Sequence, residues 1–142
     1  MTIGRIIEGR EASILTCEAN RTVEQAVAML AEHKIGALPI VEGSAVIGIF
    51  SERDVIYKLS KLGTQALQLL VRDAMTTPAI TVTSSTGALE ALSLMTRRRM
   101  RHLPVLENDR MIGFVSIGDL VKYRIDKIQS EAEALREYIQ TA

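Results

Sequence analysis

One short phrase is written twice in this chain, and no other feature limits the possible folds as strongly. In the first copy, Leu38–Val41 is followed by Ile47–Ser51, and Asp54 lies three residues after the serine. Each position of the phrase has a counterpart 65 residues later without a gap (116 − 51 for the serines), so the second copy ends on Ser116 and Asp119. An internal repeat of this length indicates that one structural unit is present twice.

Each copy predicts the order strand, helix, strand, strand, helix. Apolar runs indicate the first strand, helical spacing of apolar residues indicates the first helix, and the repeated phrase reads as a hairpin. The expected first strand and first helix are Ile14–Cys17 and Val23–Leu30 in copy one, and Ala79–Val82 and Ala88–Met95 in copy two. The second helix is expected to start near Glu52 and near Ile117.

One such unit leaves an apolar sheet face exposed, so the two units are expected to pack face to face about an approximate two-fold axis. The predicted fold class is therefore α/β (α+β), with two β-α-β-β-α repeats and an added C-terminal helix. Residues 1–71 are assigned to the first repeat with an N-terminal lead-in, and residues 72–142 to the second repeat with the C-terminal helix.

The C-terminal helix carries a regular apolar stripe. Its members are spaced 4, 3, 4, 3 and 4 residues apart, as in a coiled-coil seam. They are Val121, Ile125, Ile128, Ala132, Leu135 and Ile139. Two interpretations stay open at this point: the stripe docks on its own domain, or it is shared with a second chain.

Composition excludes several classes of function. The 142 residues include 17 acidic and 17 basic side chains, so no net charge attracts nucleic acid or an anionic membrane. The single Cys17 rules out an internal disulfide and a cysteine-rich metal site. No signal peptide is seen in Met1–Arg10, and no apolar run is long enough for a membrane span, so we expect a cytoplasmic protein. No Gly-rich phosphate loop is present and no nucleophile is paired with a base, so we expect no enzymatic activity.

The serine and aspartate of each copy point to a phosphate and a sugar. Ser51 and Ser116 stand where a strand gives way to a helix, and the first turn of a helix offers unpaired N–H groups and a partial positive charge. Asp54 and Asp119 lie one turn further on, where a carboxylate can accept hydrogen bonds from both ribose hydroxyls. The same Ser-x-x-Asp spacing is also close to a helix capping box, which needs no ligand. The two roles are compatible.

These tandem motifs resemble a pair of cystathionine-β-synthase (CBS) domains, also called a Bateman module. The resemblance covers roughly Ile14–Val121, and its strength lies in two copies in ungapped register. It implies the fold described above, with adenosine-containing ligands bound in clefts between the repeats. It also implies a regulatory role, in which adenine nucleotides or related compounds are sensed on behalf of a partner.

The resemblance assigns further site residues. Arg53 adds a cation to copy one, whereas copy two has Gly118 there and must take its cation from Arg101 and His102 before the strand, or from Arg98 and Arg99. Because Gly36 and Ala37 stand at the positions of Arg101 and His102 in copy one, the two sites should not be alike. The predicted flanks of the adenine are Thr16, Thr81, Ile80, Ile35 and Met100.

The resulting hypothesis is a regulatory module that binds AMP, with NAD(H), ATP and S-adenosylmethionine as other ligands. NADP is a poor candidate, because a carboxylate at the ribose disfavours a 2′-phosphate. We expect a homodimer that acts on a client protein. Two alternatives remain: a ligand-free structural dimerisation module, and a nucleic-acid-associated regulator that uses the basic run Arg97–Arg101.

Overall fold

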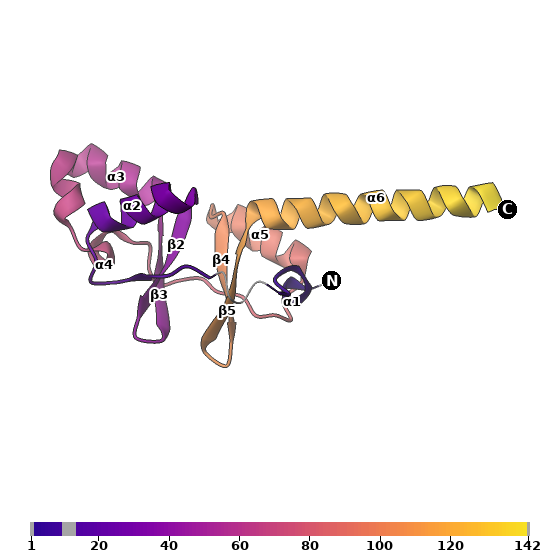
Figure 1. Cartoon of the computed structure of the whole chain (residues 1–142), viewed down its shortest axis with the longest axis horizontal. Coiled ribbons are helices and arrows are strands. Elements are labelled where there is room, and N and C mark those ends of the chain that lie inside the picture. Colours follow the sequence, from indigo (N-terminus) through magenta and orange to yellow (C-terminus); the bar gives the residue numbers. More distant parts are fainter. Residues whose placement is uncertain (1, 10–13, 142) are drawn as a thin grey trace.

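The computed structural model describes residues 2–9 and 14–141 and consists of two similar halves (Figure 1). The first half contains β1 (Cys17–Glu18), α2 (Val23–His33), β2 (Ala37–Glu42), β3 (Ala45–Ser51) and α3 (Glu52–Leu62). The second half contains α5 (Ala88–Arg98), β4 (His102–Glu107), β5 (Arg110–Ser116) and α6 (Ile117–Thr141). Between them lie η2 (Gly63–Gln68) and α4 (Val71–Ala74), and α1 (Ile3–Ile6) precedes the first half.

The predicted duplication is confirmed at the level of single residues. The helices α2 and α5, and both hairpins, begin and end at positions 65 apart, for example Ala37 and His102 (102 − 37). Both hairpins are antiparallel, and their registers shift at equivalent places, after Ile40 and after Val105. The mixed α/β class, the two repeats and the C-terminal helix are as predicted.

The first strand of each copy is shorter than predicted. Only Cys17–Glu18 pairs with β2, in parallel, and Val82 alone forms a bridge to Val105. Only the end of each apolar run lies alongside the hairpin. The preceding residues Ile14 and Leu15 instead line a cavity between the two halves. The apolar runs therefore predicted the buried Cys17 and Val82 correctly, whereas the residues before them are only half-buried and do not pair as strands.

Each half has its own apolar core, and each core takes in a segment from outside the half. Val71 and Ala74 of α4 are buried with the core of the first half. The N-terminal Ile3 and Ile7 are buried with the core of the second half, although they lie at the opposite end of the chain. The predicted lead-in, which lies partly outside the described residues, therefore packs on the second repeat and ties the two halves together.

Two glycines of the repeated phrase make room for these crossing segments. A Cβ atom on Gly48 would come within 2.8 Å of the carbonyl oxygen of Thr76, and one on Gly113 within 2.7 Å of the Cδ1 atom of Ile7. Because packed interiors leave no space for such atoms, glycine is required on the inner face of both hairpins.

The helix α6 begins inside the second half and continues well beyond it (Figure 1). Leu120 near its start is fully buried, whereas the residues of the predicted stripe are exposed. Docking of the stripe on its own domain, one of the two predicted alternatives, is therefore wrong. None of the helices within residues 2–9 and 14–141 has both the length and the hydropathy that a membrane crossing requires.

Candidate functional site

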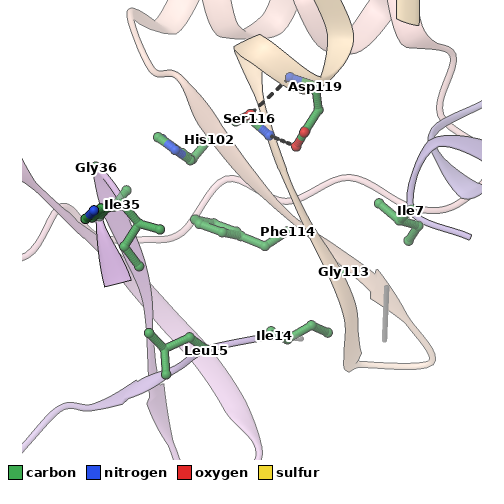
Figure 2. A pocket seen from close by; sticks show the side chains of 12 residues that line it. Ile7, Ile14, Leu15, Ile35, Gly36, His102, Gly113, Phe114, Ser116 and Asp119 are labelled. Carbon is green, nitrogen blue, oxygen red and sulfur yellow. Dashed lines mark hydrogen bonds between the residues drawn. The ribbon is translucent and has the colours of Figure 1, made fainter. Parts of the chain in front are cut away.

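A cavity of about 410 Å³ lies between the two halves (Figure 2). One wall comes from the first half, with the segment before β1 and the loop that joins α2 to β2. The opposite wall comes from β4, β5 and the start of α6 in the second half. The lining residues are Ile7, Ile14, Leu15, Lys34, Ile35, Gly36, Ala37, His102, Gly113, Phe114, Ser116 and Asp119.

Ser116 and Asp119 stand together at one end of this cavity. The Ser116 backbone N–H donates to Asp119 Oδ2 at 2.9 Å, and the Asp119 backbone N–H donates to Ser116 Oγ at 3.1 Å. This reciprocal pair caps the N-terminus of α6, as the alternative capping interpretation predicted. Alternation along β5 buries Val115 and turns Phe114 and Ser116 towards the other half. A helix start with its partial positive charge therefore opens on the cavity.

An aromatic surface lies next to the capped helix start. Figure 2 shows Phe114 pointing from β5 towards Ile35, with His102 nearby. The rings of His102 and Phe114 are stacked, with centroids 5.3 Å apart and an angle of 18° between their planes. Burial lowers the pKa of His102, against the opposing effects of Asp119 and Glu52. Neutral His102 and Phe114 thus form a flat, weakly polar wall on which another ring can stack.

Lys34 supplies a cation from the first half. It ends α2 in the left-handed conformation, with φ of 53°, and the next three residues of the chain also line the cavity. Sequence reasoning named Ile35 as a wall but missed Lys34, Phe114 and Leu15. A useful signal was available for Phe114, because its counterpart at the same strand position of the first copy is Ile49.

The equivalent motif of the first half is arranged differently. Ser51 and Asp54 cap α3 in the same way, with the Ser51 N–H donating to Asp54 Oδ2 at 2.9 Å. However, Asp54 Oδ1 also accepts a hydrogen bond of 3.0 Å from the hydroxyl of Thr76, in the segment between the repeats. Ser51 and Asp54 are not among the residues that line the cavity.

Arg53 connects the two halves instead of facing the cavity. Its Nη1 atom donates to the carbonyl oxygen of Arg99 at 2.9 Å. Arg99 ends α5 in the left-handed conformation, with φ of 53°, as Lys34 ends α2. This contact joins the start of α3 to the end of α5 across the pseudo-symmetric interface.

Comparison with known proteins identifies the family. The CBS domain family matches residues 10–61 and 71–126, which correspond to the two halves. The chain belongs to the CBS domain family. It is 40% identical over 135 residues to the CBS domain-containing protein CBSX3, mitochondrial, of Arabidopsis thaliana. That alignment covers 92% of this chain but 66% of the Arabidopsis protein.

Solved structures support the fold of this CBS pair. A putative signal-transduction protein with CBS domains from Burkholderia ambifaria is 37% identical, with a TM-score of 0.83, over 89% of this chain and 95% of that one. The structure of CBSX2 in complex with AMP is 25% identical, with a TM-score of 0.74, over 88% of this chain and 96% of that one.

The remaining residues predicted for the site of the CBS pair lie outside the cavity. Met100 and Ile80 are half-buried against the core of the second half. Arg101 is exposed, and its carbonyl oxygen accepts a hydrogen bond from the backbone of Ile117. Thr16 and Thr81 are half-buried in the segments that lead into Cys17 and Val82.

The exposed basic run of the CBS pair does not form a wall of the cavity either. Arg97, Arg98 and Arg99 lie at the end of α5 and are exposed. His102 is the first residue after this run that lines the cavity. Within the described ranges, no group of three or more His, Cys, Asp or Glu side chains is arranged to hold a metal ion.

Proposed function

We propose that this CBS pair is a regulatory module that binds one adenosine-containing nucleotide, AMP in the first instance, in the cavity between its repeats. The observation that carries the proposal is the helix start at Ser116 and Asp119, which opens on a cavity walled by both repeats. Its volume of about 410 Å³ is within the range of small-molecule sites. The AMP complex of CBSX2, a protein of similar fold and 25% identity, supports the choice of ligand.

Each part of the nucleotide has a partner of suitable chemistry. The phosphate would lie at the N-terminus of α6, close to the Gly118 N–H and the Ser116 hydroxyl, because the N–H groups of Ile117 and Asp119 already donate to the Arg101 carbonyl and to Ser116 Oγ. Lys34 lines the same cavity from the first half and can contribute positive charge. Asp119 would accept hydrogen bonds from the ribose hydroxyls, since a carboxylate has about four acceptor positions. The adenine would stack on Phe114 between apolar residues such as Ile35 and Leu15.

Regulation would follow from the position of the ligand between the halves. A nucleotide that contacts Lys34 on one side and Ser116 on the other fixes the relative tilt of the two repeats. The nucleotide can shift the equilibrium between two tilts of the repeats only if it binds these two arrangements with unequal affinity. A homodimer partner or a separate client protein would bind differently to the module when this tilt changes. The cytoplasmic location remains a prediction, and the name of the Arabidopsis relative places that protein in mitochondria.

Titration calorimetry with a small set of nucleotides tests the proposal. We expect AMP to bind and NAD⁺, ATP or S-adenosylmethionine to compete with it. Adenosine 2′-monophosphate, matched to AMP in charge and size, should bind at least about tenfold more weakly, because its phosphate meets the carboxylate of Asp119. Failure of all four adenosine compounds to bind or to raise the melting temperature at millimolar concentration would favour the ligand-free dimerisation module. Salt-sensitive binding of RNA or DNA without any nucleotide binding would favour the regulator that uses Arg97–Arg101.

A further inference from the structure

The outer face of α6 carries an unbroken line of exposed apolar side chains. The exposed fractions are 45% for Val121, 50% for Ile125, 49% for Ile128, 58% for Leu135 and 65% for Ile139, and Ala132 is also exposed. We call these six residues the α6 seam. Single exposed apolar residues are ordinary on protein surfaces, but a continuous line over five helical turns indicates a surface that another helix covers.

The α6 seam is separate from the face by which α6 packs on its own repeat. Leu120 and Tyr123 hold the start of the helix against the core of the second half. Val121 follows Leu120 by one residue, which is a rotation of about 100° around the helix axis. Within the described part of the chain, every residue from Ile128 to Thr141 is exposed (Figure 1). Helices of this kind are normally stabilised by packing of an apolar face, and no residue that the structure describes in the same chain packs on this half of α6.

We propose that the α6 seam pairs with the same seam of a second copy of this chain in a parallel, two-stranded coiled coil. The spacing places Ile125, Ala132 and Ile139 at heptad positions a, and Val121, Ile128 and Leu135 at positions d. Isoleucine at a with leucine at d favours two parallel strands, a pattern that Ile139 and Leu135 follow, whereas the β-branched Val121 and Ile128 at d do not. The charges beside the seam therefore carry the parallel orientation, and sedimentation decides the number of strands. The proposal deepens the predicted homodimer by naming its surface and orientation, and it does not depend on the nucleotide.

The charges that flank the seam distinguish parallel from antiparallel pairing. In a parallel pair, Glu131 at position g faces Arg136 at position e of the second copy, and the reciprocal contact is identical. In an antiparallel pair with all six layers matched, Glu131 would face Glu131 and Lys122 would face Arg136. The flanking positions therefore attract in the parallel arrangement and repel in the antiparallel one.

The remaining charges of α6 do not reverse this preference. Arg124 stands at position g, where it faces the uncharged Gln129 in a parallel pair and Tyr138 in an antiparallel one. The other charged residues stand at positions b, c and f, which point away from a partner helix; they are Asp119, Asp126, Lys127, Glu133 and Glu137. Across a coiled coil such positions are separated by more than the Debye length of about 8 Å at physiological salt, so their interaction is largely screened.

Analytical ultracentrifugation of the full chain without nucleotide tests the interface. We expect a dimer at micromolar concentration that Leu135→Glu weakens at least about tenfold, because it places a charge in the seam. Ala134→Glu adds the same charge to the same exposed helix outside the seam and should leave the dimer unchanged. A monomeric wild-type chain, or a dimer equally stable in both variants, would overturn the proposal.

A charge reversal and an added cysteine test the orientation. Arg136→Glu should weaken a parallel dimer, because Glu131 then faces a glutamate, and adding Glu131→Arg should restore it. In an antiparallel dimer Arg136→Glu would instead remove the repulsion from Lys122 and strengthen association. Ile139→Cys should form an intermolecular disulfide only in the parallel arrangement, because only there does residue 139 face its own counterpart. The native Cys17 is 1% exposed and should not form a competing disulfide. A strengthened Arg136→Glu dimer, or no disulfide at Ile139→Cys, would contradict parallel pairing.

Discussion

The two halves of the molecule share a sequence phrase, a set of elements and a helix cap, but they differ at the cavity between them, which Ser116 and Asp119 line and Ser51 and Asp54 do not. Asp119 lies at the cavity wall, whereas Asp54 accepts a hydrogen bond from the hydroxyl of Thr76. Arg53, the cation of the first motif, is hydrogen-bonded to the carbonyl oxygen of Arg99. Duplication therefore preserved the backbone of the motif while its surroundings diverged.

The segments that cross between the halves cause this difference. The segment between the repeats runs along the outer edge of β3, where the backbones of Ile49 and Thr76 exchange two hydrogen bonds of 3.0 and 2.8 Å. This brings the Thr76 hydroxyl to Asp54. At the equivalent strand of the second half, the side chain of Ile7 covers Gly113, and the outward face of Phe114 borders the cavity. A repeated motif is therefore a candidate site, and the connecting segments decide which copy can be used.

The largest effect is expected from a methyl group added beneath the crossing segments. Gly48→Ala should lower the free energy of unfolding by about 1–3 kcal/mol, because its Cβ meets not only the movable Sδ of Met75 at 2.5 Å but also the backbone oxygen of Thr76 at 2.8 Å, which is held in the sheet. Gly113→Ala should cost less, since the three atoms nearest to its Cβ all belong to the side chain of Ile7 and none to the backbone. Urea denaturation of both variants measures the difference. An equal or larger loss for Gly113→Ala would contradict the structural account of the crossing segments.

The next largest effect concerns nucleotide affinity. Asp119→Asn should weaken AMP binding by roughly tenfold, about 1.4 kcal/mol, because it removes the charge that strengthens hydrogen bonds from the ribose. Asp54→Asn is the matched control and should change AMP affinity by less than about twofold. Both asparagines can still accept the capping hydrogen bond, so the folds should persist. Titration calorimetry in which the two variants lose the same affinity would show that the halves are not functionally different.

A smaller effect is expected at the hydrogen bond that Thr76 donates to Asp54. Thr76→Val removes the hydroxyl that donates to Asp54 Oδ1 and should lower the free energy of unfolding by no more than about 1 kcal/mol, since the threonine is exposed. AMP affinity should not change. Thr76→Ser keeps the hydroxyl and serves as the control in the same denaturation series. A marked loss of AMP affinity in Thr76→Val alone would place the nucleotide at Asp54.

The smallest effect is the dependence of stability on pH at His102. Burial lowers its pKa in the folded state, so the unfolded chain binds more protons below a pH of about 6.5. The contribution of His102 to stability is therefore complete above that pH and is lost as the pH falls from 6.5 towards the lowered folded-state pKa. His102→Gln should reduce the loss of stability between pH 7.5 and 5.5, measured by thermal denaturation at both values. An unchanged or steeper loss in the variant would show that Asp119 and Glu52 outweigh burial.

Much of the fold could be predicted because each sequence pattern that indicates a strand, a helix or a turn is present in both copies. The hairpins, the helices after them and the start of α6 at Ile117 lie where the spacing placed them. The shortened first strands could not be predicted from the apolar runs, because burial in a strand and burial against a cavity give the same pattern.

The site could be predicted only in part. The motif predicted Ser116 and Asp119, and the family resemblance predicted His102 as a cation; all three line the cavity. The predicted charge of His102 is wrong, because burial lowers its pKa. The motif could not predict that Thr76 donates a hydrogen bond to Asp54, or that Lys34 of the other repeat lines the same cavity. These contacts depend on how the two repeats dock, which no local pattern in either copy encodes.

The stoichiometry of AMP binding tests the central difference between the halves most directly. Calorimetric titration of the full chain should give one AMP per chain, and Asp119→Asn should weaken that single event. Two equivalent AMP molecules per chain, or one that Asp54→Asn weakens in preference to Asp119→Asn, would contradict the assignment of the site to the second repeat.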